Sequence, residues 1–470
     1  MLNLQIDSSV INKKLFLSAI LVLALQAHAQ EWMNDMASGC QVWNTEQNVK
    51  SVSWAGECVD NKANGTGILR VTLIDRNEER YEGRFINGKA NGIGKYTWPN
   101  LSVYEGDFID GNRSGHAKYS FSDGSYYDGD FTDGLRTGKG KFVWNNGSSY
   151  EGDFIDSKQT GKGKFIWSSG GEYEGDFIDG LQTGKGKFKW PDGSYYEGDF
   201  LNGIRQGMGI FVYADHNRYE GSFVDGKPMG KGKFFWENGN RYEGDFLAGN
   251  QTGQGVFSWI DGKRYEGEFI NGQQMGKGKF TWLDKSSYEG DFIKGAQTGK
   301  GKFTFSDGSY YVGGFINGAQ TGKGKFVWSN GVQYEGDFIN GAQTGKGKLS
   351  FTDGSYYEGD FINNIQSGKG KFFWSDHSSY EGTFSDGIPA SNGKHSWSNG
   401  MVFEGNIVGN KKEGFGRFSI PKTLYTIELS SNGKWVGEYF VYQGMFLDDA
   451  FITSCAKASE CKPLKTPSKK

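Results

Sequence analysis

The sequence predicts an all-β fold, an elongated single sheet of stacked antiparallel β-hairpins. Three observations predict it: a motif that recurs every 23 residues, apolar and charged residues that alternate within each copy, and glycine-rich turns between the alternating stretches. A fixed period of this length indicates stacked copies of one small unit. The motif, Tyr-Glu-Gly or a close variant, begins at Tyr81, Tyr104, Tyr127, Tyr150, Tyr173, Tyr196, Tyr219, Tyr242, Tyr265, Tyr288, Tyr311, Tyr334, Tyr357, Tyr380 and Phe403.

The copy that begins at Tyr334 shows how one unit is built. Tyr334, Gly336 and Phe338 alternate with two acidic residues, which is typical of a strand with one covered face. We expect the glycine-rich stretch 340–345 to reverse the chain and a second strand to follow it. Asp353-Gly354 is a hairpin-turn signal that leads to the next copy.

Two series of aromatic residues are expected on the covered face, one in each strand of the hairpin. Their representative members are Phe154, Trp167, Phe177, Trp190, Phe246, Trp259, Phe292 and Trp328. Glycines alternate with these rings on the same face, and a glycine lets a neighbouring ring lie over the backbone. We expect the rings to set stability, because truncating a buried ring costs ~3–5 kcal/mol.

The opposite face carries acids on the first strand and lysines on the second. We expect Asp153 and Glu151 to face Lys162 and Lys164 within one hairpin. Each such cross-strand pair is worth ~0.2–1 kcal/mol. The charges therefore fix register and solubility more than they determine stability.

One copy departs from this charge pattern. Val312 and Gly314 stand where other copies have acids. The nearby lysines then lose two balancing charges, which predicts a candidate cationic patch for an anionic partner. The alternative is neutral sequence drift in one of many copies, without a functional role. The patch lysines are Lys300, Lys302, Lys323 and Lys325.

Composition and motifs give no case for catalysis. The formal net charge of −3 offers no general case for nucleic-acid binding. The segment Gly295–Gly301 has the wrong spacing for a phosphate loop, so no nucleotide is expected. The acids recur in every copy, and the histidines are expected at the surface or in turns. These histidines are His116, His216, His377 and His395. We predict no enzyme, no catalytic residue, no cofactor and no metal.

The N-terminus is typical of an export signal. Two lysines precede the apolar run Leu15–Leu25, and Ala27-His28-Ala29 follows as a small-residue cleavage site. The run is too short to span a bilayer, which needs ~20 residues. A buried N-terminal helix is the alternative. We expect residues 1–29 to be removed and the protein to be periplasmic or secreted.

The cysteines lie near the two ends of the chain. Cys40 and Cys58 lie near one end, and Cys455 and Cys461 near the other. An even number in an exported protein indicates disulfides, and three pairings are open. Proximity in sequence favours Cys40–Cys58 and Cys455–Cys461. Unpaired small hydrophobic residues are the alternative, and no histidines lie near to complete a zinc site.

The consensus Tyr-Glu-Gly-Asp-Phe-Ile-Asn-Gly-x-x-x-Gly-Lys-Gly-Lys-Phe-x-Trp-x-Asp-Gly closely resembles the MORN repeat, the membrane occupation and recognition nexus. The likeness covers about 81–418, and the chain is identified as an exported bacterial type. Segment 54–58 is similar to a divergent first copy, and Trp435 is expected to begin a last one. The predicted domains are 1–29, signal peptide; 30–53, N-terminal cap; 54–423, repeat array; 424–454, C-terminal capping hairpin; 455–470, disulfide loop and basic tail.

The resemblance implies a non-enzymatic scaffold that contacts proteins or membranes. We expect protein–protein interaction or self-association, with part of the aromatic face open as a long groove. The alternative is a membrane-associated protein that binds peripherally to an anionic lipid surface. A carbohydrate role is conceivable, since aromatic platforms suit sugars, although the rings are expected to be committed to packing.

Overall fold

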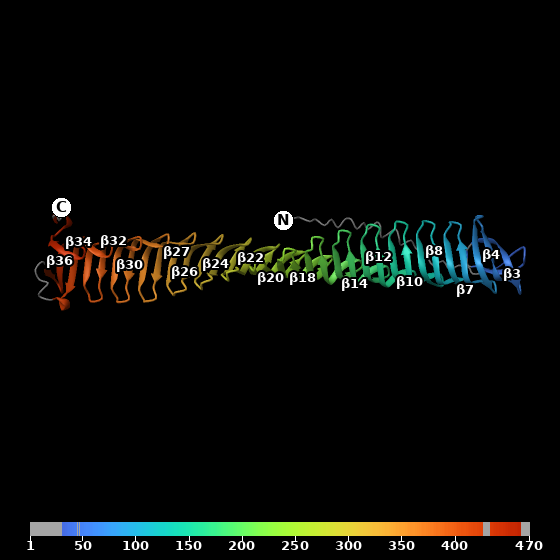
Figure 1. The fold of residues 1–470 in the computed structure, drawn as a ribbon, viewed down its shortest axis with the longest axis horizontal. Coiled ribbons are helices and arrows are strands. Elements are labelled where there is room, and N and C mark those ends of the chain that lie inside the picture. Colours follow the sequence, from blue (N-terminus) through green and yellow to red (C-terminus); the bar gives the residue numbers. More distant parts are fainter. Residues whose placement is uncertain (1–30, 45, 47, 426–432, 462–470) are drawn as a thin grey trace. The chain divides into compact units, whose positions relative to one another are not determined.

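The computed structural model describes residues 31–44, 46, 48–425 and 433–461. The chain forms two compact units, 1–214 and 215–470. Within each unit the strands lie side by side in one open, almost wholly antiparallel sheet (Figure 1). The fold is therefore the predicted all-β array of stacked hairpins. The predicted signal segment 1–29 lies outside the described residues.

The first unit holds a short N-terminal segment and then hairpins in sequence order. Its described strands are β1 (Glu31–Asn34), β2 (Gln41–Asn44), β3 (Val49–Val59), β4 (Lys62–Leu73), β5 (Glu78–Ile86), β6 (Lys89–Thr97), β7 (Val103–Ile109), β8 (Asn112–Ser120), β9 (Tyr126–Thr132), β10 (Leu135–Val143), β11 (Ser149–Ile155), β12 (Lys158–Ile166), β13 (Glu172–Ile178), β14 (Leu181–Lys189), β15 (Tyr195–Leu201) and β16 (Ile204–Val212). From β5 to β15 each strand pairs with the strands before and after it, so each copy adds one hairpin to the sheet of this unit.

The second unit continues the same pattern to the C-terminal region. Its described strands are β17 (Arg218–Val224), β18 (Lys227–Phe235), β19 (Arg241–Leu247), β20 (Asn250–Ser258), β21 (Arg264–Ile270), β22 (Gln273–Thr281), β23 (Ser287–Ile293), β24 (Ala296–Thr304), β25 (Tyr310–Ile316), β26 (Ala319–Val327), β27 (Gln333–Ile339), β28 (Ala342–Ser350), β29 (Tyr356–Ile362), β30 (Ile365–Phe373), β31 (Ser379–Ser385), β32 (Ile388–Ser396), β33 (Val402–Val408), β34 (Lys411–Pro421), β35 (Lys434–Val436), β36 (Tyr439–Leu447) and β37 (Ala450–Ser454). Two short 3-10 helices, η1 (Lys422–Leu424) and η3 (Ala458–Glu460), lie near its end.

The turn within each hairpin is tighter than predicted. In the Tyr334 copy the chain reverses at Asn340 and Gly341, which have φ of 50° and 83°. Both residues need positive φ in a two-residue type I′ turn, and Asn-Gly supplies it at low cost. The expectation that 340–345 forms the turn is wrong, because β28 already begins at Ala342. The remaining glycine-rich residues form a bulge in that strand.

The turn between hairpins contains the tryptophan series. At Phe351, which stands in this series, the backbone N–H donates to the carbonyl of Ser355 at 2.8 Å, and Gly354 N–H donates to Phe351 at 3.2 Å. The second aromatic series therefore lies in a turn, although the alternation predicted it within a strand. The Asp353 carboxylate accepts hydrogen bonds from the hydroxyl and N–H of Ser355, which hold the pKa of Asp353 below its usual value.

The interior of the sheet is built on the tyrosine that begins each copy. Tyr150 is fully buried, and its hydroxyl donates to the carbonyls of Asp153 at 3.0 Å and Thr160 at 3.4 Å. A Cβ on Gly163 would lie 2.5 Å from Tyr150 Cε2. Glycine holds this place in every in-register copy but one, in which Ala117 lies under the fully buried ring of Tyr104. Burial raises the pKa of these phenols, to about 12 at Tyr334.

Tyrosine and phenylalanine alternate along the buried ladder. Tyr173 lies 5.1 Å from Phe177 of its own copy and 5.1 Å from Phe200 of the next, both edge to face. The predicted ladder residues Phe154, Phe177, Phe246 and Phe292 are between 2 and 4 % exposed. The predicted tryptophans Trp167, Trp190, Trp259 and Trp328 are only half-buried and pack on second-strand rings. Tyrosine and phenylalanine, more than tryptophan, therefore form the core.

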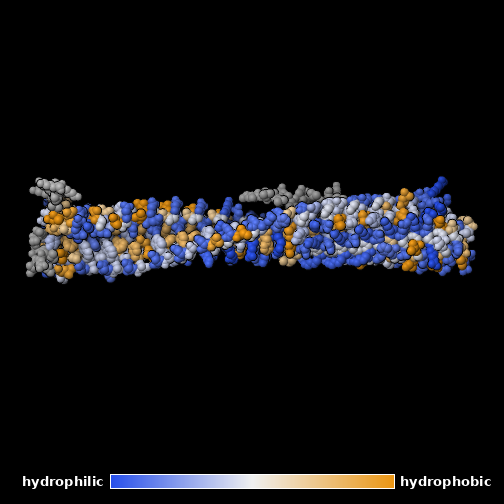
Figure 2. Space-filling view, viewed as in Figure 1, coloured by the Kyte–Doolittle hydropathy of each residue, from blue (hydrophilic) through white to orange (hydrophobic). Residues whose placement is uncertain are grey.

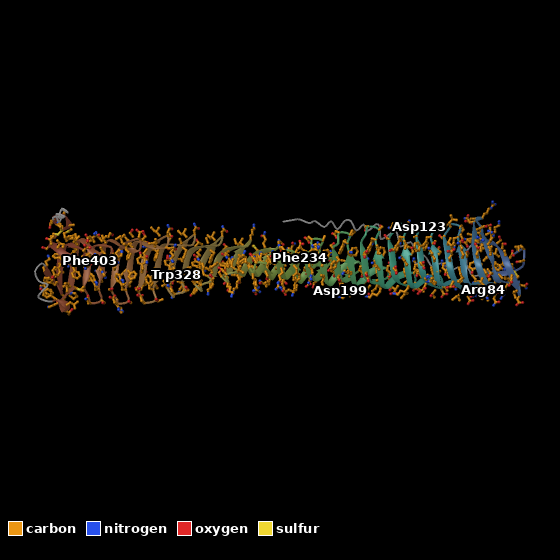
Figure 3. All side chains as sticks on the ribbon, viewed as in Figure 1. Arg84, Asp123, Asp199, Phe234, Trp328 and Phe403 are labelled. Atoms are coloured by element: carbon orange, nitrogen blue, oxygen red, sulfur yellow. A yellow bond between two sulfur atoms is a disulfide. The ribbon has the colours of Figure 1, made fainter. Side chains whose placement is uncertain are left out.

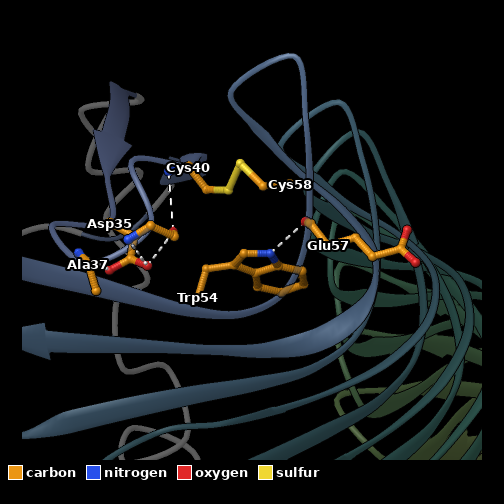
Figure 4. The surroundings of a disulfide bond; sticks show 7 residues. Asp35, Ala37, Cys40, Trp54, Glu57 and Cys58 are labelled. Atoms are coloured by element: carbon orange, nitrogen blue, oxygen red, sulfur yellow. Dashed lines mark hydrogen bonds between the residues drawn. A yellow bond between two sulfur atoms is a disulfide. The ribbon is translucent and has the colours of Figure 1, made fainter.

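The N-terminal hairpin closes the array with a substituted ring. Trp54 in β3 occupies the place that tyrosine holds elsewhere, and it packs on Phe85 at 4.6 Å between centroids. Its indole N–H donates to the Glu57 carbonyl at 2.9 Å (Figure 4). Beside it a disulfide joins Cys40 to Cys58, with Cα atoms 5.9 Å apart. This hairpin is the divergent first copy that the sequence indicated.

The last copy begins later than predicted. Tyr442, Gly444 and Phe446 in β36 reproduce the Tyr-x-Gly-x-Phe pattern, and Phe446 packs 5.1 Å from Phe403. Trp435 lies in the short strand β35 that precedes them, so the expectation that it begins the unit is wrong. Much of the predicted segment 424–429, and the basic tail from 462, lie outside the described residues.

Glu79 gives the N-terminal hairpins a pH dependence that can be measured. It is buried in β5 and accepts a hydrogen bond from the Tyr96 hydroxyl. Burial, together with the charges of Glu46 and Asp75, raises its pKa from 4.5 to about 7. A raised carboxyl pKa stabilises the folded chain fully below pH 4.5, and this contribution is lost as the pH rises to about 7.

We therefore expect Glu79→Gln to stabilise these hairpins above pH 7 and to change little at pH 4.5. The measurement is local hydrogen exchange and thermal unfolding of variant and wild type at both pH values. Comparison of the two proteins removes the contribution of the other carboxylates. A difference between them that does not vary with pH would contradict the assignment.

Candidate interaction surface

The charged face is held by ion pairs between neighbouring hairpins. Lys162 Nζ lies 2.6 Å from Asp176 of the next copy, and Lys139 Nζ lies 2.6 Å from Asp153. The Lys162 ammonium lowers the pKa of Asp176. Each exposed pair contributes only ~0–1 kcal/mol, but the row repeats along the array. The ion pairs therefore align successive copies.

The predicted pairing within one hairpin is right for one of its two pairs. Glu151 stands opposite Lys164 across the hairpin. Asp153 does not stand opposite Lys162, because the bulge at Gly161, whose φ is 58°, shifts the register. Asp153 instead accepts a hydrogen bond from the Lys162 backbone N–H at 3.0 Å.

An exposed row of branched aliphatic side chains lies along the margin of the charged face. They occupy the sixth place of the copies, and strand alternation places them on the same face as the acids. The aliphatic row consists of Ile86, Ile109, Ile155, Ile178 and Leu201 in the first unit and Val224, Leu247, Ile270, Ile293, Ile316, Ile339, Ile362 and Val408 in the second. These residues are between 38 and 60 % exposed. Figure 2 shows hydrophobic residues recurring along the exposed surface of each unit.

Successive members of the aliphatic row are two strands apart, which places them about 10 Å from one another. The sequence contained this signal, because the residue after Phe338 alternates onto the side of Glu335 and Asp337. The row was not predicted, because the aromatic rings give the stronger repeating pattern. Exposed apolar residues in a regular row indicate an interaction surface.

The aromatic face is mostly closed. The first-strand tyrosines and phenylalanines of the copies from Tyr81 to Phe384 are at most 6 % exposed. The expectation of a long open groove is therefore wrong for this ladder, because each tyrosine folds onto its own glycines. The tryptophan series stays half-exposed, as at Trp328 (Figure 3).

The lysines of the predicted cationic patch lie on the strands on either side of Val312 and Gly314. Gly314 lies opposite Lys300, and Val312 lies between Lys302 and Lys325 on the neighbouring strands. In the described part of the chain, no carboxylate oxygen lies within 4.0 Å of the ammonium of these three lysines. Replacement of two acids leaves these charges unneutralised locally.

Lys323 does not belong to the unneutralised set, because its ammonium lies 2.8 Å from Asp337 of the next copy. The charged face is hollowed beside the patch by a groove of about 1350 Å³. Glu266 and Glu289 also line this groove, so its charge is mixed. Five lysines and two glutamates line it.

The motifs and histidines considered in the sequence take the following places in the structure. Among the residues that the structure describes, no group of three or more His, Cys, Asp or Glu side chains is placed to hold a metal. The segment Gly295–Gly301 forms a hairpin turn and part of β24, and no helix follows it. His395 corrects one expectation, because it stacks between Trp374 at 5.1 Å and Trp397 at 4.0 Å instead of lying in a turn. Burial lowers its pKa.

The other predicted site residues are the cysteines near the C-terminus and the remaining histidines. Cys455 is joined to Cys461, with Cα atoms 5.5 Å apart, so both disulfides follow sequence proximity. His216 and His377 lie in turns with φ of 62° and 69°. His116 lies in β8 beside two aspartates.

Comparison with known families decides what the hairpin array is. The family model described as the MORN repeat matches fifteen consecutive copies, from 81–103 to 403–422, at the 23-residue period of the hairpins. The chain belongs to the MORN repeat family. MORN repeats are generally scaffolds that contact proteins or membranes, and they are typically non-catalytic.

Other comparisons add little to the MORN assignment. No curated protein matches the chain. The TCP domain of Drosophila melanogaster SAS-4, solved with a proline-rich motif, is similar at 9 % identity over 42 % of this chain and 85 % of that one, with a TM-score of 0.20. A streptogramin B lyase is similar at 13 % identity over 63 and 91 %, TM-score 0.11. Virginiamycin B lyase from Staphylococcus aureus is similar at 11 % identity over 65 and 93 %, TM-score 0.10.

The described residues contain no helix of the length and apolarity that a membrane crossing requires.

Proposed function

We propose that this MORN protein is a non-enzymatic, exported scaffold that associates with a second copy of itself through the aliphatic row. The row carries the proposal. In each unit, aliphatic side chains that recur at the 23-residue period, five in the first and eight in the second, are left half in water, although each hairpin has a buried ladder to accept apolar residues. Hydrophobic surface exposed in this way is stabilised by burial against a partner.

A second copy is the partner that matches the row best. Its own row has the same spacing of about 10 Å, so the two can interleave along many repeats. An unrelated protein would need a hydrophobic surface with this period. The charged residues beside the row then provide the polar rim that protein interfaces have.

Export is supported by the Lys-rich and apolar N-terminal sequence and by the two disulfides. Disulfides form and persist in oxidising compartments such as the periplasm or the extracellular space. Fractionation of host cells, with the thiol state of Cys40 and Cys455 measured in each fraction, tests this part. Full-length protein with free thiols in the cytosol would contradict it.

We expect the triple variant Ile293→Asn, Ile316→Asn, Ile339→Asn to weaken self-association by about tenfold or more, because each change removes apolar area from the interface. The measurement is sedimentation velocity over a concentration series. The matched control is Ile260→Asn with Leu283→Asn, which changes turn residues that are 74 and 71 % exposed and lie outside the row. A wild-type protein that stays monomeric, or a control as weak as the triple variant, would refute the assignment.

Peripheral binding to an anionic lipid surface is the second candidate function. The unneutralised Lys300, Lys302 and Lys325 favour it, since clustered lysines are attracted to anionic headgroups. Sedimentation with vesicles of phosphatidylglycerol and phosphatidylcholine distinguishes lipid binding from self-association. Salt-sensitive sedimentation that is lost in Lys300→Glu, Lys302→Glu supports lipid binding, and salt-independent self-association supports the scaffold.

A further inference from the structure

The series of aromatic rings on the second strand of each hairpin is interrupted at one place. In every in-register copy but one, the second strand carries a ring at the position aligned with Leu349. These residues are Tyr96, Tyr119, Phe142, Phe165, Phe188, Phe211, Phe234, Phe257, Phe280, Phe303, Phe326, Phe372, His395 and Phe418. Elsewhere a turn tryptophan packs between two such rings, as Trp282 does with Phe280 at 4.6 Å and Phe303 at 5.2 Å.

Leu349 leaves the indole of Trp328 with a ring on one side alone. Trp328 lies 4.7 Å from Phe326, and leucine stands where the second ring would pack. A pocket of about 490 Å³ lies in this gap, within the range of ligand sites. Phe338, Leu349 and Val332 form the rest of its apolar wall. We name it the Leu349 pocket.

The side chain of Gln343 lines the Leu349 pocket, and its amide is not fully enclosed by protein. Gln343 is 6 % exposed, and no described residue hydrogen-bonds its side chain. Its backbone N–H donates to Asn364 Oδ1 at 2.8 Å. Asn364 stands where the neighbouring copies have Gly341 and Gly387, and it lines the same pocket. Two substitutions, at Leu349 and at Asn364, therefore shape one site.

We propose that the Leu349 pocket binds a neutral pyranose ring of a glycan. The C–H face of a pyranose fits an indole that lacks a stacking partner, and its hydroxyls both donate and accept, as amides do. No charged residue lines the pocket, which disfavours phosphate and carboxylate ligands. The site lies on the aromatic face, opposite the aliphatic row, so it does not depend on self-association.

An aromatic side chain of a peptide is the competing occupant. It would replace the missing ring but would leave the Gln343 amide buried without a partner, which costs ~1–3 kcal/mol. A sugar hydroxyl removes that cost. The amides of Gln320 and Gln343 on the pocket wall therefore favour the sugar.

The test is ligand-observed NMR and tryptophan fluorescence on the full chain with cellohexaose, maltohexaose, chitohexaose and N-acetyltryptophanamide. We expect at least one saccharide to bind. Leu349→Phe, which restores the ring of the other copies and should fold at least as well, should weaken that binding by about tenfold or more. Gln343→Leu should also weaken it, whereas the matched control Gln297→Leu, next to the intact Phe303, should not.

Three results would overturn the proposal. One is failure of all three saccharides to bind the wild-type chain. Another is saccharide binding that Leu349→Phe leaves unchanged. The third is binding of N-acetyltryptophanamide with no saccharide binding, which would identify the occupant as an aromatic side chain.

Discussion

Replacing Gly324 by valine should unfold the hairpins on either side of it, although the copy at Tyr104 accommodates the smaller Ala117 at the equivalent place. Gly324 lies in β26 beneath the ring of Tyr311, and an added Cβ would come within 2.6 Å of Tyr311 Cζ. The ring has no free space to move into, because it is fully buried. Its hydroxyl also donates to the carbonyls of Gly314 at 3.2 Å and Thr321 at 3.4 Å.

Expulsion of the ring should cost as much as its deletion, ~3–5 kcal/mol. The loss of the single hydroxyl proton's bifurcated hydrogen bond should add ~1 kcal/mol. We would measure hydrogen exchange of the β25 and β26 amides, because local stability is what a repeat protein loses first. Protection there should fall while β33 and β34, many copies away, keep theirs.

The control is Gly322→Asn, two residues earlier in the same strand. Gly322 has φ of +66° and nothing within 4 Å of an added Cβ. Asparagine adopts this conformation more readily than other L-residues, so the change should cost less than ~1 kcal/mol. Equal losses in the two variants would show that backbone conformation, and not ring packing, makes glycine necessary in this strand.

The parts of the fold that were predictable are those that repeat locally. Alternation around Tyr334 and Phe338 gave the strand and its buried face, because each copy carries the complete pattern. The glycines were interpreted correctly for the same reason. The two-residue turn at Asn340-Gly341 was also predictable from its dipeptide, and the prediction failed by extending it over the whole glycine-rich stretch.

The ion-pair partners were harder to predict, since they depend on a single bulge. Alternation alone sets Asp153 against Lys162 in one hairpin. The left-handed Gly161 inserts an extra residue, and Asp153 then pairs with Lys139 of the preceding hairpin. A bulge changes every partner beyond it, and several glycines in this stretch could have formed it.

The candidate sites were likewise predictable where they repeat in each copy and not where they depend on more than one copy. The aliphatic row repeats in the sequence. Strand alternation alone places Ile339 on the same face as the acids of its strand, so the row could have been predicted. The last copy at Tyr442 was missed because an insertion breaks the 23-residue period before it. The Leu349 pocket depends on how Trp328 packs against rings of two successive copies, which no single copy reveals.

Replacing Phe292 by alanine should be as damaging as the glycine variant, through the opposite effect of a cavity. Phe292 is 2 % exposed and lies 5.2 Å from Tyr288 of its own copy and 5.0 Å from Tyr265 of the preceding one. Its loss removes a contact on both sides of a repeat boundary. We expect a cost of ~3–5 kcal/mol.

Trp282→Ala, in the same region, tests whether the buried ladder or the tryptophan series holds the array together. Trp282 is half-buried, so its truncation should cost roughly 2 kcal/mol, about half as much. Ile293→Ala is the control, because it truncates the residue next to Phe292. The Ile293 side chain is 55 % exposed and should contribute little to the stability of the isolated chain. Chemical denaturation, followed by amide hydrogen exchange, ranks the three variants by their loss of stability.

The spatial extent of the Phe292 effect is the sharper part of this prediction. Each copy contacts only the copies beside it, so a lost contact should lower protection in β21 to β24 and decay with distance along the unit. Uniform loss throughout the second unit would mean that its hairpins unfold as one cooperative body. In that case stability would come from long-range cooperativity of the sheet, and contacts between adjacent rings would not explain it.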